Sequence, residues 1–81
     1  MSPAAKPTPN YAQALAAFAE RFYGPEWQRP LSRAIGVHFN TIYRVARAAR
    51  DGRDYATAQR LLADLRLHLL DMANEMEPWV R

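Results

Sequence analysis

The sequence predicts an all-helical protein of four to five helices, and three features of its 81 residues indicate this. Apolar residues recur three and four positions apart in several segments, which is the spacing of one face of an α-helix. Turn signals separate these segments at Gly24-Pro25, Gly36 and Asp51-Gly52. The last segment is the longest, and it carries a stripe of leucine and methionine. We therefore expect short helices followed by one long C-terminal helix.

The chain divides into three parts. Residues 1–9 contain three prolines and no apolar periodicity, so we expect an extended N-terminal arm. Residues 10–53 form the expected core, and its first helix begins after the capping residue Asn10 and ends near Tyr23. Residues 54–81 form the C-terminal helix. Four residues share the face of the first helix that we expect to cover the core: Tyr11, Leu15, Phe18 and Phe22.

Residues 28–47 predict two short helices joined by a glycine turn. Leu31 and Ile35 lie four positions apart and share one face of the first of these helices. Gly36 ends it, because glycine adopts a positive φ without steric cost, and Val37 then fills the corner between the two helices. Ser32 is small, as the crossing of two helices requires. Trp27, just before this pair, is expected in the core.

The segment from 28 to 47, about a quarter of the chain, resembles the helix-turn-helix of small bacterial and phage transcriptional regulators. Seven residues carry the resemblance: Leu31, Ser32, Ile35, Gly36, Val37, Ile42 and Val45. Two residues depart from the family pattern, because His38 stands where serine or threonine usually caps the second helix and Phe39 stands where a polar residue is common. The resemblance implies sequence-specific binding of double-stranded DNA, and repression of a promoter. A packed helical hairpin without DNA is the alternative interpretation.

Positive charge coincides with this segment. The net charge is +3, but residues 20–53 carry seven arginines against three acidic residues, whereas residues 54–81 are net negative. A protein that displaces counterions from phosphates needs such a concentration of charge. A solvated arginine face without a nucleic-acid partner is the alternative.

The third helix is expected from about Phe39 to Ala49, and its outward face supplies the candidate base contacts. With Ile42 and Val45 turned inward, that face holds Phe39, Asn40, Tyr43 and Arg44. Arg44 can donate two hydrogen bonds to guanine and Asn40 can bond to adenine, each worth about 1 to 3 kcal/mol of discrimination. Phe39 is open to two interpretations, contact with a thymine methyl or packing against the neighbouring helix. The candidate DNA backbone contacts are Gln28, Arg29, Arg33, Thr41 and Arg47, with Arg50 and Arg53 as possible extensions.

The C-terminal helix is expected from Asp54, its cap, to Glu77, with Pro78 as its stop. Its apolar residues alternate four and three positions apart from Ala58, which is typical of a coiled-coil seam. We expect a homodimer, with these interface residues: Leu62, Leu65, Leu69, Met72 and Met76. A dimer predicts an inverted-repeat operator with recognition helices about 34 Å apart. Packing of this helix against its own core alone is the other interpretation.

Other functional classes find little support in the sequence. The chain has no cysteine and two distant histidines, so we expect no metal and no cofactor. No catalytic constellation or phosphate loop is present, so we expect neither an enzyme nor a small-molecule substrate. No apolar run has the length of a signal peptide or membrane span, which favours the cytoplasm. Two alternatives remain: an accessory factor for recombination or DNA packaging, and a protein-interaction module without DNA binding.

Overall fold

The computed structural model describes residues 10–80, and in that range it is all-helical, as the sequence predicts. Four α-helices are followed by a short 3₁₀ helix. Their bounds are α1 Tyr11–Tyr23, α2 Gln28–Ile35, α3 Phe39–Arg50, α4 Thr57–Met76 and η1 Glu77–Trp79. The expected N-terminal arm, residues 1–9, lies outside the described residues.

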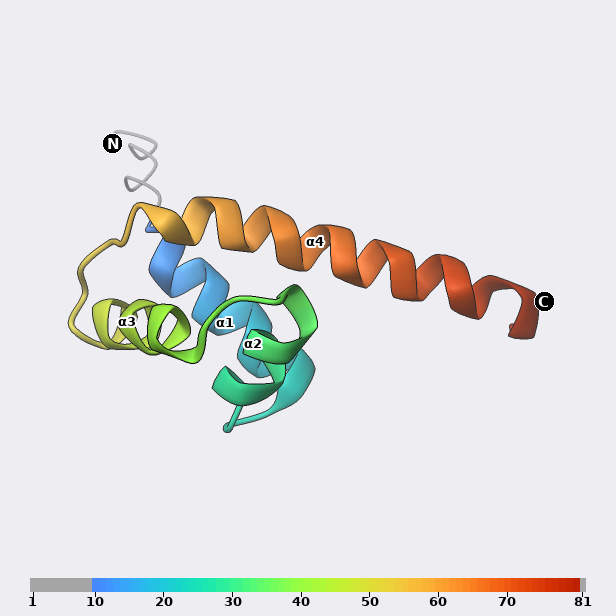
Figure 1. Ribbon diagram of the computed structural model, residues 1–81, viewed down its shortest axis with the longest axis horizontal. Helices are drawn as coiled ribbons and strands as arrows, with labels where there is room; N and C mark the ends of the chain where they lie inside the picture. Colours follow the sequence, from blue (N-terminus) through green and yellow to red (C-terminus); the bar gives the residue numbers. More distant parts are fainter. Residues whose placement is uncertain (1–9, 81) are drawn as a thin grey trace, which may run out of the picture.

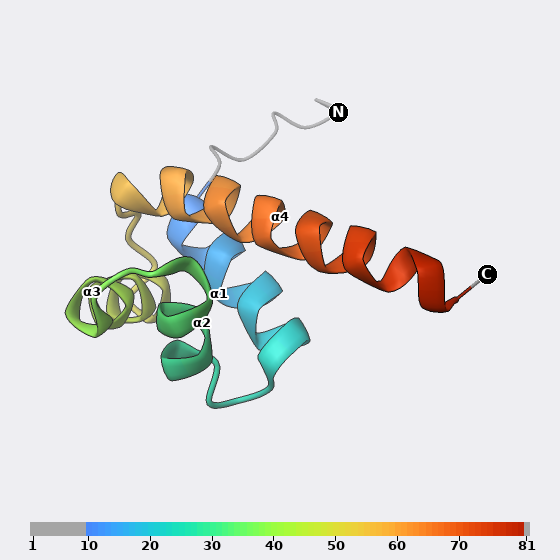
Figure 2. The same cartoon turned by 45° about the vertical axis from the view of Figure 1, so that its right-hand side comes forward.

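The first three helices form a cluster against the N-terminal half of α4. Helix α1 packs against the other three, and α2 packs against both α3 and α4. The C-terminal half of α4 extends beyond this cluster, as both views show (Figures 1 and 2). One apolar core unites the cluster, with these buried residues: Ala12, Leu15, Ala19, Trp27, Leu31, Ile42, Val45, Ala48, Ala58, Leu61 and Leu65. Trp27 is therefore a core residue, as predicted.

The face of α1 that enters the core differs from the expected one. Leu15 is buried, but Phe18 and Phe22 are 51% and 47% exposed. The expectation that these two rings cover the core is therefore wrong. Small residues at Ala12 and Ala19 flank Leu15 instead, and they let the backbone of α1 approach its neighbours closely. The two phenylalanine rings are displaced to the edge of the cluster, beside α4.

A hydrogen bond between distant residues closes the cluster at the start of α1. The side chain of Asn10 caps α1 by accepting from the N–H of Gln13, as predicted. The carboxylate of Asp54 accepts from the N–H of Ala12, with an N···O distance of 3.1 Å. The expectation that Asp54 caps the C-terminal helix is wrong, because α4 begins at Thr57 without a side-chain cap. Asp54 therefore bonds to the beginning of α1 and not to the beginning of α4.

The turn between α2 and α3 follows the prediction. Gly36 adopts φ 66° and ψ 34°, a left-handed conformation, and its N–H bonds to the carbonyl of Ser32. The N–H of Val37 bonds to the same carbonyl, while the Ser32 hydroxyl donates to the carbonyl of Val37. His38 caps α3, because its Nδ1 accepts from the N–H of Asn40 at 3.1 Å. A histidine thus supplies the cap, where serine, threonine, aspartate and asparagine are the residues generally preferred at a helix N-terminus.

Tyr23 holds a buried hydroxyl at the end of α1. Its ring packs edge-on against Phe22, with centroids 4.8 Å apart. The hydroxyl has no hydrogen-bond partner among the described residues. Burial disfavours the charged phenolate, and so raises the pKa of Tyr23 above its ordinary value of 10.0.

Candidate nucleic-acid interface

The outer face of α3 presents most of the predicted base-contact residues to solvent. Ile42 and Val45 are fully buried and fix the inner face of the helix. Asn40, Tyr43 and Arg44 are exposed, with 46% of Tyr43 accessible. Because the side chains of an α-helix repeat about every 3.6 residues, two buried apolar residues are enough to turn these three outward. The structure thus places them where a partner can reach them.

Phe39, the fourth predicted base contact, lies against α2. Its ring is half-buried, and the guanidinium carbon of Arg29 lies 4.8 Å from the ring centroid. This cation–π contact ties the beginning of α2 to the beginning of α3. Of the two interpretations of Phe39, the structure shows packing against the neighbouring helix. Arg29 remains exposed, so its outer edge is open to solvent.

The predicted backbone-contact residues border the same surface in part. Arg33 of α2 and Arg47 of α3 are exposed, whereas Gln28 and Thr41 are half-buried. A shallow hollow of about 280 Å³ brings Gln28 and Arg47 together. Its lining comes from three helices and the residue before α2: Ala16, Trp27, Gln28, Tyr43, Ala46, Arg47 and Arg50. The beginning of α2 therefore lies beside the second half of α3.

Arg50, which the sequence predicts only as an extension of the backbone contacts, also lines this hollow. It follows Arg47 by three residues and Tyr43 by seven, so all three share one face of α3. This spacing is the sequence signal that could have placed Arg50 among the main predicted backbone contacts. Trp27 also lines the hollow while only 7% of it is exposed, which makes it a rigid floor for the surrounding polar groups.

The charge of this surface has one sign. Residues 28–50, which span α2, the turn and α3, contain five arginines and no aspartate or glutamate. Within residues 10–80, the arginines that form ion pairs are Arg53, with Asp51, and Arg60, with Asp64. The arginines of α2 and α3 are therefore not neutralised by carboxylates of the described chain. Such a surface attracts a polyanion.

The residues predicted for the dimer interface divide into two groups. Leu65 is 1% exposed and belongs to the core of the monomer, so it offers almost no surface to a second chain. Leu62, Leu69 and Met72 are half-buried, and Met76 is 52% exposed. The predicted seam thus begins inside the cluster and emerges from it toward the C-terminal end of α4.

Among the described residues, no three histidine, aspartate or glutamate side chains gather as a metal ion would require. The helices of that part of the chain also lack the length and apolar character needed to cross a bilayer.

Comparison with known proteins finds no match for this chain. No protein-family model matches the chain, and no curated protein or solved structure is significantly similar to it. The function of this surface has to be inferred from its own side chains.

Proposed function

We propose that the protein binds double-stranded DNA in a sequence-specific manner and acts as a small, non-enzymatic transcriptional regulator of the bacterial and phage helix-turn-helix type. Helix α3 is the recognition helix and enters the major groove, while α2 lies across the DNA backbone. The observation that carries this proposal is the outer face of α3, where exposed Asn40 and Arg44 stand in a surface without carboxylates.

The side chains in the first turns of α3 discriminate between bases. Arg44 is exposed and forms no ion pair with the described chain, so its guanidinium is available to the O6 and N7 of guanine. Asn40 has its backbone N–H held by His38, which fixes the beginning of the helix and leaves the amide side chain in solvent. An amide in this place matches the N6 and N7 of adenine. Tyr43, one turn after Asn40, reaches a base edge or a phosphate.

The hollow between α2 and α3 is the site that binds a DNA phosphate. Helix α2 begins without a side-chain cap, so its first N–H groups and the positive end of its dipole remain available to bind an anion. Arg47 and Arg50 line the same hollow and supply charge. A phosphate at this point would fix the register of α3 in the groove without reading sequence. Arg29 and Arg33 extend the contact along α2.

Repression is the regulatory outcome that such an interface supports most directly, because a dimer bound to an inverted repeat covers a promoter and blocks the polymerase. An accessory factor for recombination or packaging would use the same interface at a different site. A protein-interaction module would not bind DNA through this interface, so its arginines on α2 and α3 would make no phosphate contacts.

Selection of bound sequences from a random duplex pool tests the proposal directly. We expect an enriched inverted repeat, and an affinity for it that falls steeply as the salt concentration rises. Arg60→Ala is a matched control, since Arg60 is an exposed arginine of α4 outside the interface; it should retain the selected sequence and nearly the full affinity. A pool that stays random, with no salt-dependent retention of DNA, would reject DNA binding and favour the protein-interaction module.

A further inference from the structure

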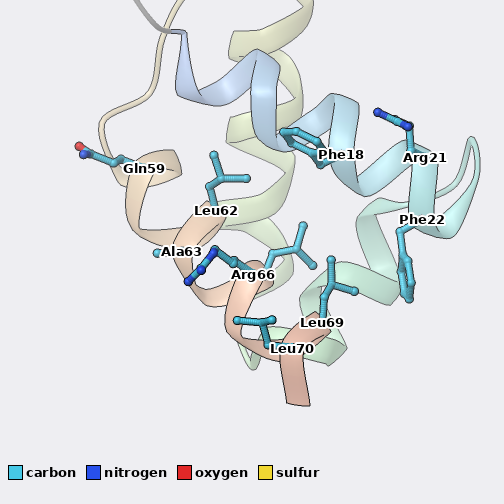
Figure 3. Close-up of a pocket in the computed structure, with 10 residues that line it drawn as sticks. Phe18, Arg21, Phe22, Gln59, Leu62, Ala63, Arg66, Leu69 and Leu70 are labelled. Carbon is cyan, nitrogen blue, oxygen red and sulfur yellow. The ribbon is translucent and has the colours of Figure 1, made fainter. Parts of the chain in front are cut away.

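An apolar groove lies between α1 and α4, on residues that the proposed DNA contacts do not use. Its volume is about 810 Å³. The rings of Phe18 and Phe22 border it from α1, and Leu62, Leu69 and Leu70 border it from α4 (Figure 3). Both rings are about half exposed, so the groove is an open apolar surface rather than a sealed core. Exposed apolar area of this kind marks an interaction site.

The charged side chains of the groove are both positive. Arg21 of α1 and Arg66 of α4 line it, and no carboxylate does (Figure 3). An occupant of this groove should therefore be apolar along one face and acidic at its edges. This requirement distinguishes the groove from the DNA-facing surface, because the apolar lining would gain nothing from a polyanion.

The projecting end of α4 has the required composition. It leaves the cluster after the groove residues and extends away from the other helices, as Figures 1 and 2 show. Three apolar side chains at this end of the chain are exposed: Met76, the last residue of α4, by 52%, and beyond it Trp79 by 88% and Val80 by 74%. Residues 67–80 contain three carboxylates and no lysine or arginine. We name residues 71–80 the C-terminal arm.

We propose that the C-terminal arm of one copy occupies the α1–α4 groove of a second copy, and that the exchange is reciprocal. The partner is thus another molecule of this chain. The arm fits the groove in both respects, an apolar face against Phe18, Phe22 and the leucines, and acidic charge against Arg21 and Arg66. Groove and arm lie on one chain, so each copy supplies both surfaces, as a two-fold interface demands.

The spacing along α4 sets the register of the pair. Glu77, the C-cap of α4 and first residue of η1, keeps a helical backbone conformation and follows Arg66 by eleven residues, about three turns at roughly 3.6 residues per turn, so both lie on one face. In an antiparallel pair of α4 helices, Arg66 of each copy then faces Glu77 of the other. The two-fold axis passes between Leu70 and Ala73, which places a leucine opposite a small residue at the crossing. Close approach of two helices is easiest at such a point.

This arrangement differs from the seam predicted from the sequence. Leu65 contributes almost no exposed surface, because it is buried in its own monomer, although it is one of the residues that line the groove. Phe18 and Phe22, which helical periodicity predicts in the core, become part of the interface instead. The inference deepens the proposed function, on which its biological meaning rests, since an inverted repeat requires two copies.

Sedimentation equilibrium of the full chain without DNA tests the inference independently of DNA binding. We expect a concentration-dependent dimer. Leu70→Asp should raise the dimer dissociation constant by about tenfold or more, because it places a charge on the apolar lining of the groove beside the two-fold axis. Leu67→Asp is the matched control, since Leu67 is an exposed leucine of the same helix that does not line the groove. It should change the constant by less than about twofold.

A charge exchange tests the register. Arg66→Glu and Glu77→Arg should each weaken the dimer, and the double variant should recover most of the lost affinity. Circular dichroism of each variant checks that it remains folded. A monomeric wild type, an equal response of Leu70→Asp and Leu67→Asp, or no recovery in the double variant would overturn the inference. Binding of DNA half-sites, measured separately, shows whether the proposed function survives such a result.

Discussion

The carboxylate of Asp54 accepts a hydrogen bond from the backbone N–H of Ala12, forty-two residues earlier in the chain. This bond holds the beginning of α1 against the connection between α3 and α4. It satisfies one of the N–H groups that a helix leaves unpaired at its N-terminus. The same oxygen also accepts from the N–H of Tyr55, so Asp54 orders its own loop as well.

Asp54→Ala should therefore destabilise the whole domain rather than α4 alone. Loss of an N-terminal helix partner costs about 1 kcal/mol, which lowers the Tm of a domain of this size by roughly 4 to 8 °C. Thermal unfolding followed by circular dichroism measures this. Asp54→Asn retains a side-chain oxygen acceptor and should recover at least half of the loss. Equal stability of Asp54→Ala and the wild type would show that the bond contributes nothing.

Tyr23→Phe should stabilise the protein. The buried hydroxyl of Tyr23 has no partner among the described residues, and a buried unsatisfied polar group costs roughly 1 to 3 kcal/mol. Removing it while keeping the ring preserves the edge-on contact with Phe22. Denaturant titration at neutral pH should show a higher midpoint with an unchanged slope. A lower midpoint would mean that the hydroxyl is satisfied in solution.

The stability difference between Tyr23→Phe and the wild type should also grow at alkaline pH. Burial raises the pKa of Tyr23 in the folded state above the ordinary value of 10.0, so the unfolded chain releases this proton first. The contribution of the protonated group is thus complete below that value and is lost as the pH rises through the folded-state pKa. Unfolding series on both proteins across this range measure the effect. A constant difference would contradict it.

Gly36→Ala should strain the turn between α2 and α3. Gly36 has φ 66°, a conformation that costs a residue with a Cβ roughly 1 to 2 kcal/mol. A Cβ at this position would meet no atom within 4 Å beyond its immediate neighbours, so the loss is backbone strain and not collision. Gly36→Asn is the control, because asparagine tolerates this conformation better. Similar losses for both variants in urea unfolding would argue against this explanation.

Arg44 and Arg33 should affect DNA binding in different ways. Arg44→Ala should relax the preference at one base position of each half-site, whereas Arg33→Ala should weaken binding to all sequences and reduce the salt dependence. Arg44→Lys keeps the charge but loses the two-pronged hydrogen bond, so it should retain general affinity and lose discrimination. Fluorescence anisotropy on the selected duplex and on single-base variants measures both. Equal losses on selected and random DNA for Arg44→Ala would reject its role in base readout.

Local patterns determined most of the helix boundaries. Asn10, Gly24 and Gly36 act on neighbouring backbone groups, so their effect can be read from a few adjacent residues. The inward face of α3 was equally local, because two apolar residues three positions apart define it and thereby expose Asn40 and Arg44.

Tertiary structure decided which apolar residues are buried and where Asp54 bonds. Periodicity shows that Phe18 and Phe22 share a face with Leu15, but not how far α1 rotates to bring its alanines against the core. Asp54 comes shortly before α4, as a capping residue would. Its carboxylate nevertheless accepts a hydrogen bond from the first turn of α1, which only the tertiary fold brings near. Both outcomes depend on how close helices approach one another, a property of pairs of segments that no single segment contains.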